Sequence, residues 1–196
     1  MKKRKIICLV GKTGTGKDTC ARYLEKEFGY SVVCSYTTRP KRDYETDGVQ
    51  HYFVSKERMK EIIATEHVIA YTINEKTGIE YCATAEAIEA DKSIYIINPE
   101  GVAYLRKHND GIFDLLVVYL SLPEEEIENR VKIRGDNFEV FRKRIESERE
   151  EFDSFYEDGD YDVAIPCKGL RESEVNSTLA TYIYLLNEEE NNGKKG

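Results

Sequence analysis

Hydrophobic residues recur along the chain as short continuous runs, and most of these runs are separated by stretches with helical spacing. The first run, Lys5–Val10 (KIICLV), ends at Gly11. Helical spacing then covers Asp18–Phe28 and stops at Gly29, a residue type typical of helix ends. A continuous apolar run indicates a strand that is buried on both faces. The order of strand, glycine-rich turn and helix is the beginning of a βαβ unit.

Similar apolar runs follow further along the chain. They are Tyr30–Cys34, Ser93–Asn98, Asp114–Leu120 and Asp162–Ile165. With the first run they predict a five-stranded parallel sheet in a three-layer α/β fold. A late helix has apolar positions at helical spacing, which indicates core packing. These positions are Phe138, Phe141, Ile145, Phe152 and Phe155.

The stretch 35–83 interrupts this alternation. It begins with a polar, arginine-rich segment that predicts a loop, and it contains short alternating segments at His51–Val54 and Val68–Ile73. A helix is predicted at Lys56–Thr65. We interpret 35–83 as an insertion that covers the carboxyl edge of the parallel sheet, where α/β proteins bind their ligands.

Composition and charge narrow the class of protein. The 196 residues are enough for one α/β domain, and the net charge of −8 opposes binding to a nucleic-acid polymer. The apolar run Ile6–Val10 after the basic N-terminus is too short for an export signal or a membrane span. We therefore expect a cytoplasmic protein without membrane partners. Its five cysteines are scattered without zinc-site spacing, so we expect reduced thiols.

A glycine-rich segment between the first strand and helix carries the strongest chemical signal. It fits the pattern G-x-x-x-x-G-K, in which glycines turn backbone N–H groups inward around phosphate oxygens. Lys17 adds a mobile positive charge, and the following helix adds the positive end of its dipole. The residues expected to hold the donor phosphates are Gly11, Lys12, Thr13, Gly14, Thr15, Gly16, Lys17, Asp18 and Thr19.

Asp18 departs from this pattern, which has Ser or Thr at the position that supplies a hydroxyl to Mg²⁺. Two interpretations stay open. An acidic residue in the first turn of a helix is stabilised by the helix dipole and need not touch a metal. Alternatively, the carboxylate is a hard oxygen ligand that binds Mg²⁺ directly or through water. Thr19 also has a hydroxyl, but one helical position later points about 100° away.

The segment SYTTRPKR follows the second predicted strand and places Arg39 and Arg42 three residues apart, with Ser35 before them. Guanidinium groups bind a phosphate dianion through paired N–H groups, and hydroxyls add neutral hydrogen bonds. Beside a phosphate loop, this segment predicts a second phosphate site, for an acceptor.

Four segments, GKTGTGKDT, SYTTRPKR, DGVQHYFVS and VKIRGD, resemble the guanylate kinase family in order and spacing across nearly the whole chain. The resemblance implies a P-loop core at 1–34, 84–133 and 150–187, an acceptor-binding insertion at 35–83 and a lid at 134–149. It also implies that ATP and Mg²⁺ are used to convert GMP to GDP. Ser35, Arg39 and Arg42 would hold the acceptor phosphate, as would Tyr81.

The same resemblance assigns Arg134 to the lid and Arg144 to the following helix, where they would stabilise charge on the transferring phosphoryl group. Arg130 and Arg142 are alternatives for these roles. A competing interpretation is that these arginines pair with nearby glutamates along the helix. The glutamates concerned are Glu139, Glu146, Glu148 and Glu150.

Several positions depart from the family's pattern, and most of them concern base recognition. His51 replaces a phosphate-binding tyrosine; it can donate to a phosphate, and more strongly when protonated. A guanine-reading glutamate and its assisting serine correspond to Ala70 and Ala83. Two expected aspartates and an asparagine correspond to Ile96, Asn98 and Cys167. Either neighbours take over base recognition, or the acceptor is not GMP. The neighbours considered are Glu75, Glu80 and Asn98.

Three functions therefore compete. A nucleoside monophosphate kinase with GMP as its acceptor is favoured by TTRPKR and DGVQHYFVS. A ribose bisphosphate kinase of the same lineage is favoured by Asp18 in G-K-D and by the missing guanine readers. A third hypothesis is an interaction module that binds protein partners without catalysis, which Lys17 and the retained arginines oppose. The partners predicted for the two kinases are small phosphorylated molecules, and no oligomeric state is predicted.

Overall fold

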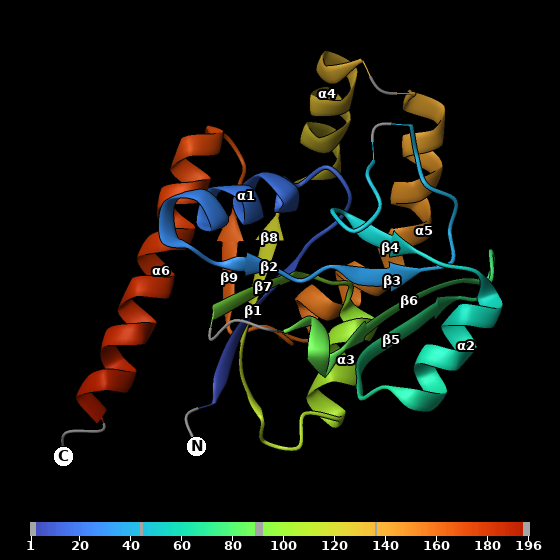
Figure 1. Cartoon of the computed structure of the whole chain (residues 1–196). Coiled ribbons are helices and arrows are strands. Elements are labelled where there is room, and N and C mark those ends of the chain that lie inside the picture. The colour runs from blue at the N-terminus through green and yellow to red at the C-terminus, as the bar shows by residue number, and fades with distance from the viewer. Residues whose placement is uncertain (1–2, 44, 89–91, 136, 194–196) are drawn as a thin grey trace. The chain divides into compact units, whose positions relative to one another are not determined.

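The structure is a computed structural model that describes residues 3–43, 45–88, 92–135 and 137–193, with side chains for all of these except 134 and 187–193. The chain folds into two compact units (Figure 1). The first contains residues 1–8 and 30–117, and the second contains 9–29 and 118–196. The division into core, insertion and lid stays a prediction.

A five-stranded sheet accounts for all five predicted apolar runs. Its strand order is β2 (Ser31–Val32), β7 (Lys92–Ile96), β1 (Arg4–Val10), β8 (Phe113–Ser121) and β9 (Val163–Pro166). The β2–β7 and β8–β9 pairs are parallel. The interior residues of β1, from Ile6 to Val10, are fully buried, as its apolar sequence predicted.

Strand β2 is shorter than its predicted range of Tyr30–Cys34. The N–H of Val33 still donates to the carbonyl of Ile94 at 2.8 Å, but the chain then leaves this sheet. It continues as β3 (Ser35–Thr37) of a second sheet, in a segment that was predicted to be a loop. Residues 35–37 form a strand because they pair with residues 51–53 and 81–82, and the polar sequence SYT does not indicate that pairing.

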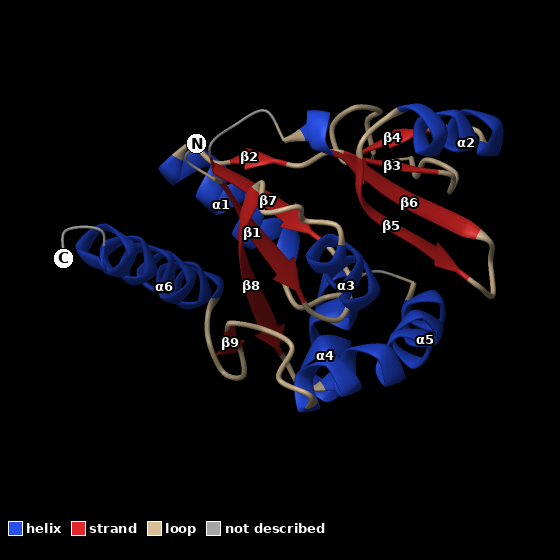
Figure 2. Cartoon of the chain, turned by 90° about the horizontal axis from the view of Figure 1, so that it is seen from below, coloured by secondary structure: helices blue, strands red, loops and turns tan. Residues whose placement is uncertain are grey.

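The second sheet lies in the first unit and has the strand order β4 (His51–Phe53), β3, β6 (Ile79–Thr84) and β5 (Val68–Asn74) (Figure 2). Strand β3 pairs in parallel with β4 and antiparallel with β6, which also pairs antiparallel with β5. The two alternating segments predicted in this stretch are confirmed as β4 and β5. Strand β6 was not predicted.

Two helices complete the described part of the first unit, together with a single 3₁₀ turn at Ala85–Ala87. Helix α2 (Lys56–Thr65) has the predicted bounds and is capped by Ser55, whose hydroxyl accepts from the N–H of Arg58. It buries Met59 and Ile62 against Cys82 of β6. Helix α3 (Pro99–Lys107) packs against β5.

The second unit contains four helices among the described residues: α1 (Lys17–Phe28), α4 (Glu124–Arg134), α5 (Phe138–Glu157) and α6 (Glu172–Gly193). Helix α1 packs against α6, and α4 packs against α5. The predicted apolar stripe of α5 is buried at Phe141, Ile145, Phe152 and Phe155, while Phe138 is half-buried. The stripe is therefore core, as predicted.

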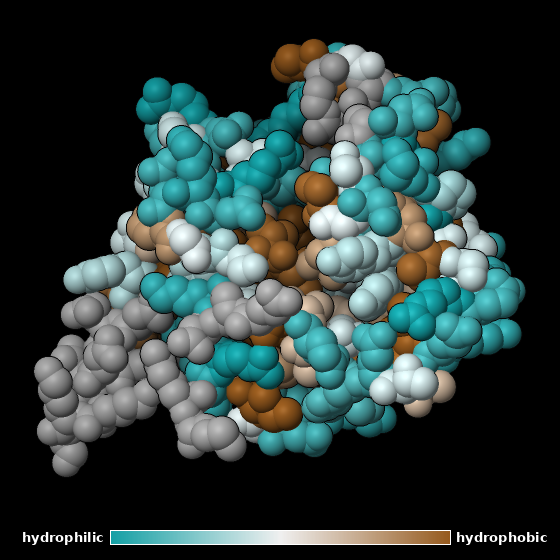
Figure 3. Space-filling model, viewed as in Figure 1, coloured by the Kyte–Doolittle hydropathy of each residue, from teal (hydrophilic) through white to brown (hydrophobic). Residues whose placement is uncertain are grey.

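The surface of the second unit carries two large apolar side chains next to the α4–α5 connection. Ile133 is 89% exposed and Val140 is 66% exposed. In Figure 3, brown hydrophobic atoms stand out at the top of the view, where Figure 1 labels α4, while hydrophilic atoms cover most of the face shown. Within the described residues, no helix has the length and apolar composition needed to cross a membrane.

Candidate functional site

The segment predicted to bind the donor phosphates, which we call the phosphate loop, connects β1 to α1, and its backbone conformation requires glycine. Gly11 and Gly14 have φ angles of 152° and 84°. A Cβ atom on Gly11 would lie 2.7 Å from the carbonyl oxygen of Leu120, and one on Gly14 would lie 2.9 Å from side-chain atoms of Ile127 and Phe141. These glycines let the loop turn tightly against β8, α4 and α5, as an anion-binding loop must to direct its N–H groups inward.

Lys17 is the first residue of α1, and its ammonium group turns back over the loop. It donates to the carbonyl of Gly11 and, at 3.0 Å, to the carbonyl of Lys12. Burial lowers the pKa of Lys17 to about 8, an effect that the negative charge of Glu148 partly opposes. The loop thus holds a partly desolvated cation whose hydrogen bonds go to carbonyl groups rather than to a carboxylate.

The lowered pKa of Lys17 predicts how anion binding depends on pH. In the free protein Lys17 is charged below about pH 8 and becomes neutral above it. A polyphosphate binds the charged form better, so its affinity should be constant below about pH 8 and then fall, approaching about tenfold per pH unit. Calorimetric titration of ADP between pH 6.5 and 9.5 measures this. Lys17→Arg, which stays charged, should lack the fall; a flat wild-type profile would contradict the prediction.

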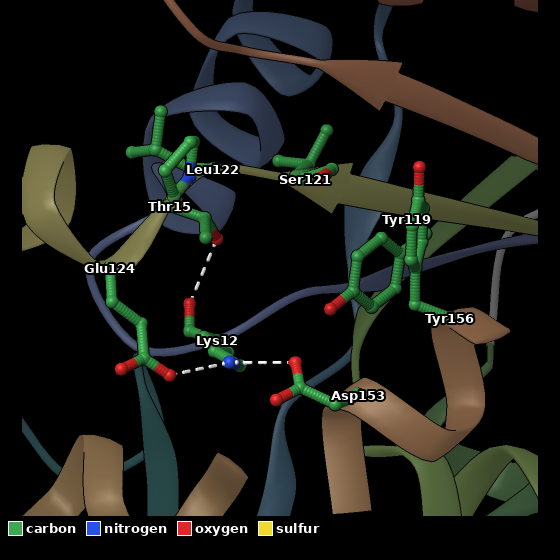
Figure 4. Close-up of a pocket in the computed structure, with 10 residues that line it drawn as sticks. Lys12, Thr15, Tyr119, Ser121, Leu122, Glu124, Asp153 and Tyr156 are labelled. Carbon is green, nitrogen blue, oxygen red and sulfur yellow. Dashed lines mark hydrogen bonds and ion pairs between the residues drawn. The ribbon is translucent and has the colours of Figure 1, made fainter.

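Lys12 forms ion pairs with two carboxylates (Figure 4). Its Nζ lies 2.7 Å from Oε1 of Glu124 and 2.8 Å from Oδ1 of Asp153. Burial opposes its charged form, but hydrogen bonds to Asp153 and Glu124 outweigh that effect and raise its pKa. Arg149 also binds Glu124, at 2.6 Å, and holds the pKa of Glu124 at about 2. The sequence placed Lys12 in the loop but gave no sign of these partners.

A pocket of about 210 Å³ opens beside this ionic cluster. Lys12 and Asp153 form part of its lining, and Tyr119 and Tyr156 contribute aromatic rings (Figure 4). The two rings lie 5.1 Å apart between centroids. The pocket thus joins a charged side, next to the phosphate loop, to an aromatic side.

Helix α5 brings two charged side chains to the phosphate loop. The N–H of Thr13 donates to Oε2 of Glu148 at 2.7 Å, and Nε of Arg144 donates to Oε1 of the same carboxylate at 2.8 Å. Arg142 pairs with Glu146 at 3.2 Å. The glutamate pairing considered from the sequence is therefore present for both arginines. The side chain of Arg134 lies outside the described residues.

Asp18 lies in the first turn of α1 and is exposed. Among the described residues, no hydrogen bond or ion pair engages its carboxylate, although its charge acts on Lys17. An exposed carboxylate beside a phosphate loop fits a divalent cation that is bound by oxygen ligands and phosphates. Its place at the helix N-terminus equally fits the dipole interpretation, so both stay open. Thr19 follows within α1 and is half-buried.

Three of the predicted acceptor residues, Ser35, His51 and Tyr81, lie in strands of the second sheet, whereas Arg39 and Arg42 lie in the segment that follows β3. Ser35 is paired with His51 across β3 and β4, and Thr37 with Tyr81 across β3 and β6. Oγ of Ser35 lies 3.0 Å from Nδ1 of His51. The rings of His51 and Tyr81 are 5.6 Å apart between centroids. Ser35, His51 and Tyr81 therefore form one cluster.

The surroundings of His51 favour its neutral form. Burial lowers the pKa of His51 to about 4, and the nearby charge of Arg39 adds to the effect. The imidazole is thus neutral at neutral pH in the free protein. It donates or accepts one hydrogen bond with Ser35, and the stronger donation expected from a protonated ring is not available without an added anion.

Arg39 forms an ion pair with a carboxylate that the sequence did not predict. Its two terminal nitrogens donate to the carboxylate of Glu45 at 2.7 and 2.6 Å, and both side chains are nearly buried. The backbone N–H of Arg42 also donates to Glu45, at 2.9 Å, and these bonds lower the pKa of Glu45 to about 2. Glu45 was not predicted from the sequence; an acid three residues after Arg42, within an arginine-rich loop, was the available signal.

Replacing Glu45 tests this pair. We expect Glu45→Gln to lower the free energy of unfolding at pH 7 by about 3 kcal/mol, because it leaves the buried guanidinium of Arg39 without its counter-charge. The lowered pKa of Glu45 means that this stability is present above the ordinary pKa and is lost as pH falls towards 2. Urea denaturation at pH 7 and pH 3.5 should therefore show a smaller difference at the lower pH.

The control for that experiment is Glu61→Gln, since Glu61 pairs with Arg58 in an exposed part of α2. Exposed pairs contribute little, so this variant should stay close to wild type. Equal stability of the Glu45 variant and wild type at pH 7 would contradict the prediction.

The positions expected to read a base edge carry methyl groups. Ala70 and Ala83 are paired across β5 and β6 and are 2% and 0% exposed. Two suggested substitutes are engaged elsewhere, since Glu80 accepts from the hydroxyl of Tyr71 at 2.8 Å and Asn98 caps α3 through Gly101. Glu75, the third, is exposed in the β5–β6 turn.

Three comparisons with known proteins all match guanylate kinases, and each match covers most of the chain. A family model described as guanylate kinase matches residues 3–183. Proteins named guanylate kinase from Streptococcus pyogenes serotypes M3 and M18 are each 32% identical over 170 residues, which cover 82% of this chain and 76% of theirs. The crystal structure of guanylate kinase from Anaplasma phagocytophilum has a TM-score of 0.62 at 16% identity and covers 94% of this chain and 87% of its own. The predicted α/β fold is confirmed by this likeness.

Proposed function

Because the chain belongs to the guanylate kinase family, we propose that it transfers the terminal phosphoryl group of ATP to a nucleoside monophosphate, with GMP as the acceptor. The products are ADP and GDP. The family supports a kinase of small nucleotides, and the two phosphate-binding clusters of the chain support the same reaction.

The phosphate loop is the observation that carries this proposal. Its glycines cannot accept a Cβ without contact at 2.9 Å or less at Gly11 and Gly14, and Lys17 is held in the loop with a pKa of about 8. A desolvated cation lowers the stability of the free protein, and a bound anion offsets that cost by neutralising the charge. A module that only bound other proteins would gain nothing from it.

On the donor side, residues 11–19 would hold the phosphates through backbone N–H groups and Lys17. The exposed carboxylate of Asp18 would hold Mg²⁺, directly or through water. When bound, Mg²⁺ neutralises charge on the donor phosphates. Arg144 of α5 is already linked to the loop by two hydrogen bonds, which meet at the carboxylate of Glu148.

On the acceptor side, the cluster of Ser35, His51 and Tyr81 offers hydroxyl and imidazole groups to a phosphate. Arg42 adds a guanidinium that is 44% exposed. The Arg39 guanidinium donates to Glu45 and to the carbonyl of Pro40, and its remaining N–H groups would face the acceptor. The ion pair with Glu45 would keep the Arg39 fork in a fixed orientation, so little side-chain entropy is lost when the acceptor binds.

The chemistry is a direct displacement. An oxygen of the acceptor phosphate attacks the terminal phosphorus of ATP as the bond to ADP breaks, and no covalent enzyme intermediate forms. Positively charged side chains stabilise the transferring group, and exclusion of water prevents hydrolysis. The residues proposed for this stabilisation are Lys17, Arg134 and Arg144.

A panel of acceptors tests the proposal. Purified protein with ATP and Mg²⁺ is offered GMP, dGMP, AMP, CMP, UMP, dTMP and ribose 1,5-bisphosphate, and ADP release is measured. We expect turnover with GMP, with a narrow margin over other nucleotides because Ala70 and Ala83 leave the base edge without polar partners. Turnover with the sugar alone, or with no acceptor at all, would overturn the proposal.

A further inference from the structure

The anion position of the phosphate loop is occupied by a side chain of this protein. The N–H of Thr13, one of the groups that such a loop directs towards phosphate, donates to the carboxylate of Glu148 at 2.7 Å. We propose that Glu148 is a resident anion of the loop, which a donor phosphate must displace, and that this displacement releases Arg144 to bind the phosphates. The inference rests on the proposed function, since it takes ATP as the displacing anion.

The geometry around Glu148 is that of a bound anion. One carboxylate oxygen accepts from the N–H of Thr13 and the other from Nε of Arg144 at 2.8 Å. The negative charge also acts on Lys17 and favours its charged form. The carboxylate thus contacts a backbone N–H and a guanidinium and lies within the electrostatic influence of an ammonium group, and these three kinds of group bind a phosphate in loops of this kind. Its side chain is only 15% exposed.

The position of Glu148 on α5 explains why it reaches the loop. Arg144 and Glu148 are four residues apart and lie on the same face of the helix. Asp153, further along α5, contacts Lys12, so the helix is held to the loop at two successive loop residues. This second contact keeps α5 next to the loop when the Glu148 contact is broken.

Phosphate and Glu148 cannot both keep their places, because both are anions that need the same N–H group. A polyphosphate brings more charge and more acceptor oxygens than one carboxylate, so it wins at sufficient concentration. Arg144 then loses its carboxylate partner next to the incoming phosphate oxygens. The exchange therefore couples binding of the donor to binding of Arg144 to the donor phosphates. It also lowers the affinity for the donor, because the contacts of Glu148 must first be broken.

Binding of ADP to Glu148→Gln tests the proposal. Glutamine has the same shape and can still accept from Thr13, but it lacks the charge. We expect the Kd of ADP at constant Mg²⁺ to be about tenfold lower than in wild type, the size expected when one charge-assisted hydrogen bond no longer has to be broken. The matched control is Glu146→Gln, which removes a charge from an exposed pair on the same helix and should leave the Kd unchanged.

The outcomes separate this inference from the proposed function. Wild-type protein that binds neither ADP nor ATP would contradict the proposed function itself. Wild-type protein that binds ADP, with a Glu148→Gln variant that binds it equally or more weakly, would overturn the inference alone. A purely structural role for Glu148 predicts weaker binding, opposite in direction. Glu148→Ala is the second variant, because alanine favours the helix, and it should also bind ADP more tightly.

Discussion

Lys17→Ala is expected to lower kcat with ATP and GMP by about a thousandfold or more, because the variant loses the charge that binds and stabilises the transferring phosphates. The melting temperature should change little, since Lys17 donates only to carbonyl groups of the loop and its burial already disfavours the charged form. Steady-state ADP release and thermal denaturation measure the two quantities. The combination of lost turnover and unchanged stability marks a functional cation.

The matched control for this prediction is Lys26→Ala. Lys26 lies on the same helix, and its side chain is 82% exposed next to Glu27. Removal of that exposed charge should leave both kcat and melting temperature near wild type. If Lys17→Ala retained full activity, the assignment of residues 11–19 to the donor phosphates would be wrong.

Arg144→Ala is expected to reduce kcat by about a thousandfold, the second large effect, if its guanidinium stabilises the phosphoryl group in transfer. The effect should appear in kcat more than in the KM for ATP, because this interaction strengthens as charge spreads over the transferring group. Single-turnover and steady-state kinetics with ATP and GMP separate the two constants.

Arg142→Ala serves as the control for Arg144. Arg142 lies on the same helix, is mostly exposed and pairs with Glu146 at 3.2 Å. We expect its loss to change kcat by less than about threefold, as for other exposed pairs. A kcat for Arg144→Ala that matched this control would place Arg144 among the arginines that only pair with glutamates.

Local sequence was enough to predict the elements with strong periodicity. Strand β1, helix α2 and the buried stripe of α5 follow directly from apolar spacing, and the end of α1 from Gly29. Neither strand β3 nor strand β6 was predicted, because both depend on pairing with each other and with β4 and β5. Their sequences SYT and IEYCAT mix polar and apolar residues without a clear period.

The site residues also fall into those that local sequence predicts and those that only tertiary contacts reveal. Gly11, Gly14 and Lys17 belong to a contiguous motif whose backbone geometry is local, so the sequence alone was enough to predict them as donor-phosphate residues. Glu45 and Glu148 are two of 37 acidic residues, and their nearness to arginines in sequence is only a weak signal because many of the other acids share it. Their importance appears only in the contacts that they make with Arg39 and with Thr13.

The sequence by itself therefore predicted the phosphate loop, the strands of the parallel sheet and the resemblance to a kinase family, because each of them can be recognised in short contiguous segments of the chain. The tertiary structure alone decided the protonation and the partners of the site residues. His51 is neutral, Arg39 is paired with Glu45, and the N–H of Thr13 in the loop donates to Glu148. Such states depend on which charges are buried together, and folding brings those residues together from positions up to 135 apart in sequence.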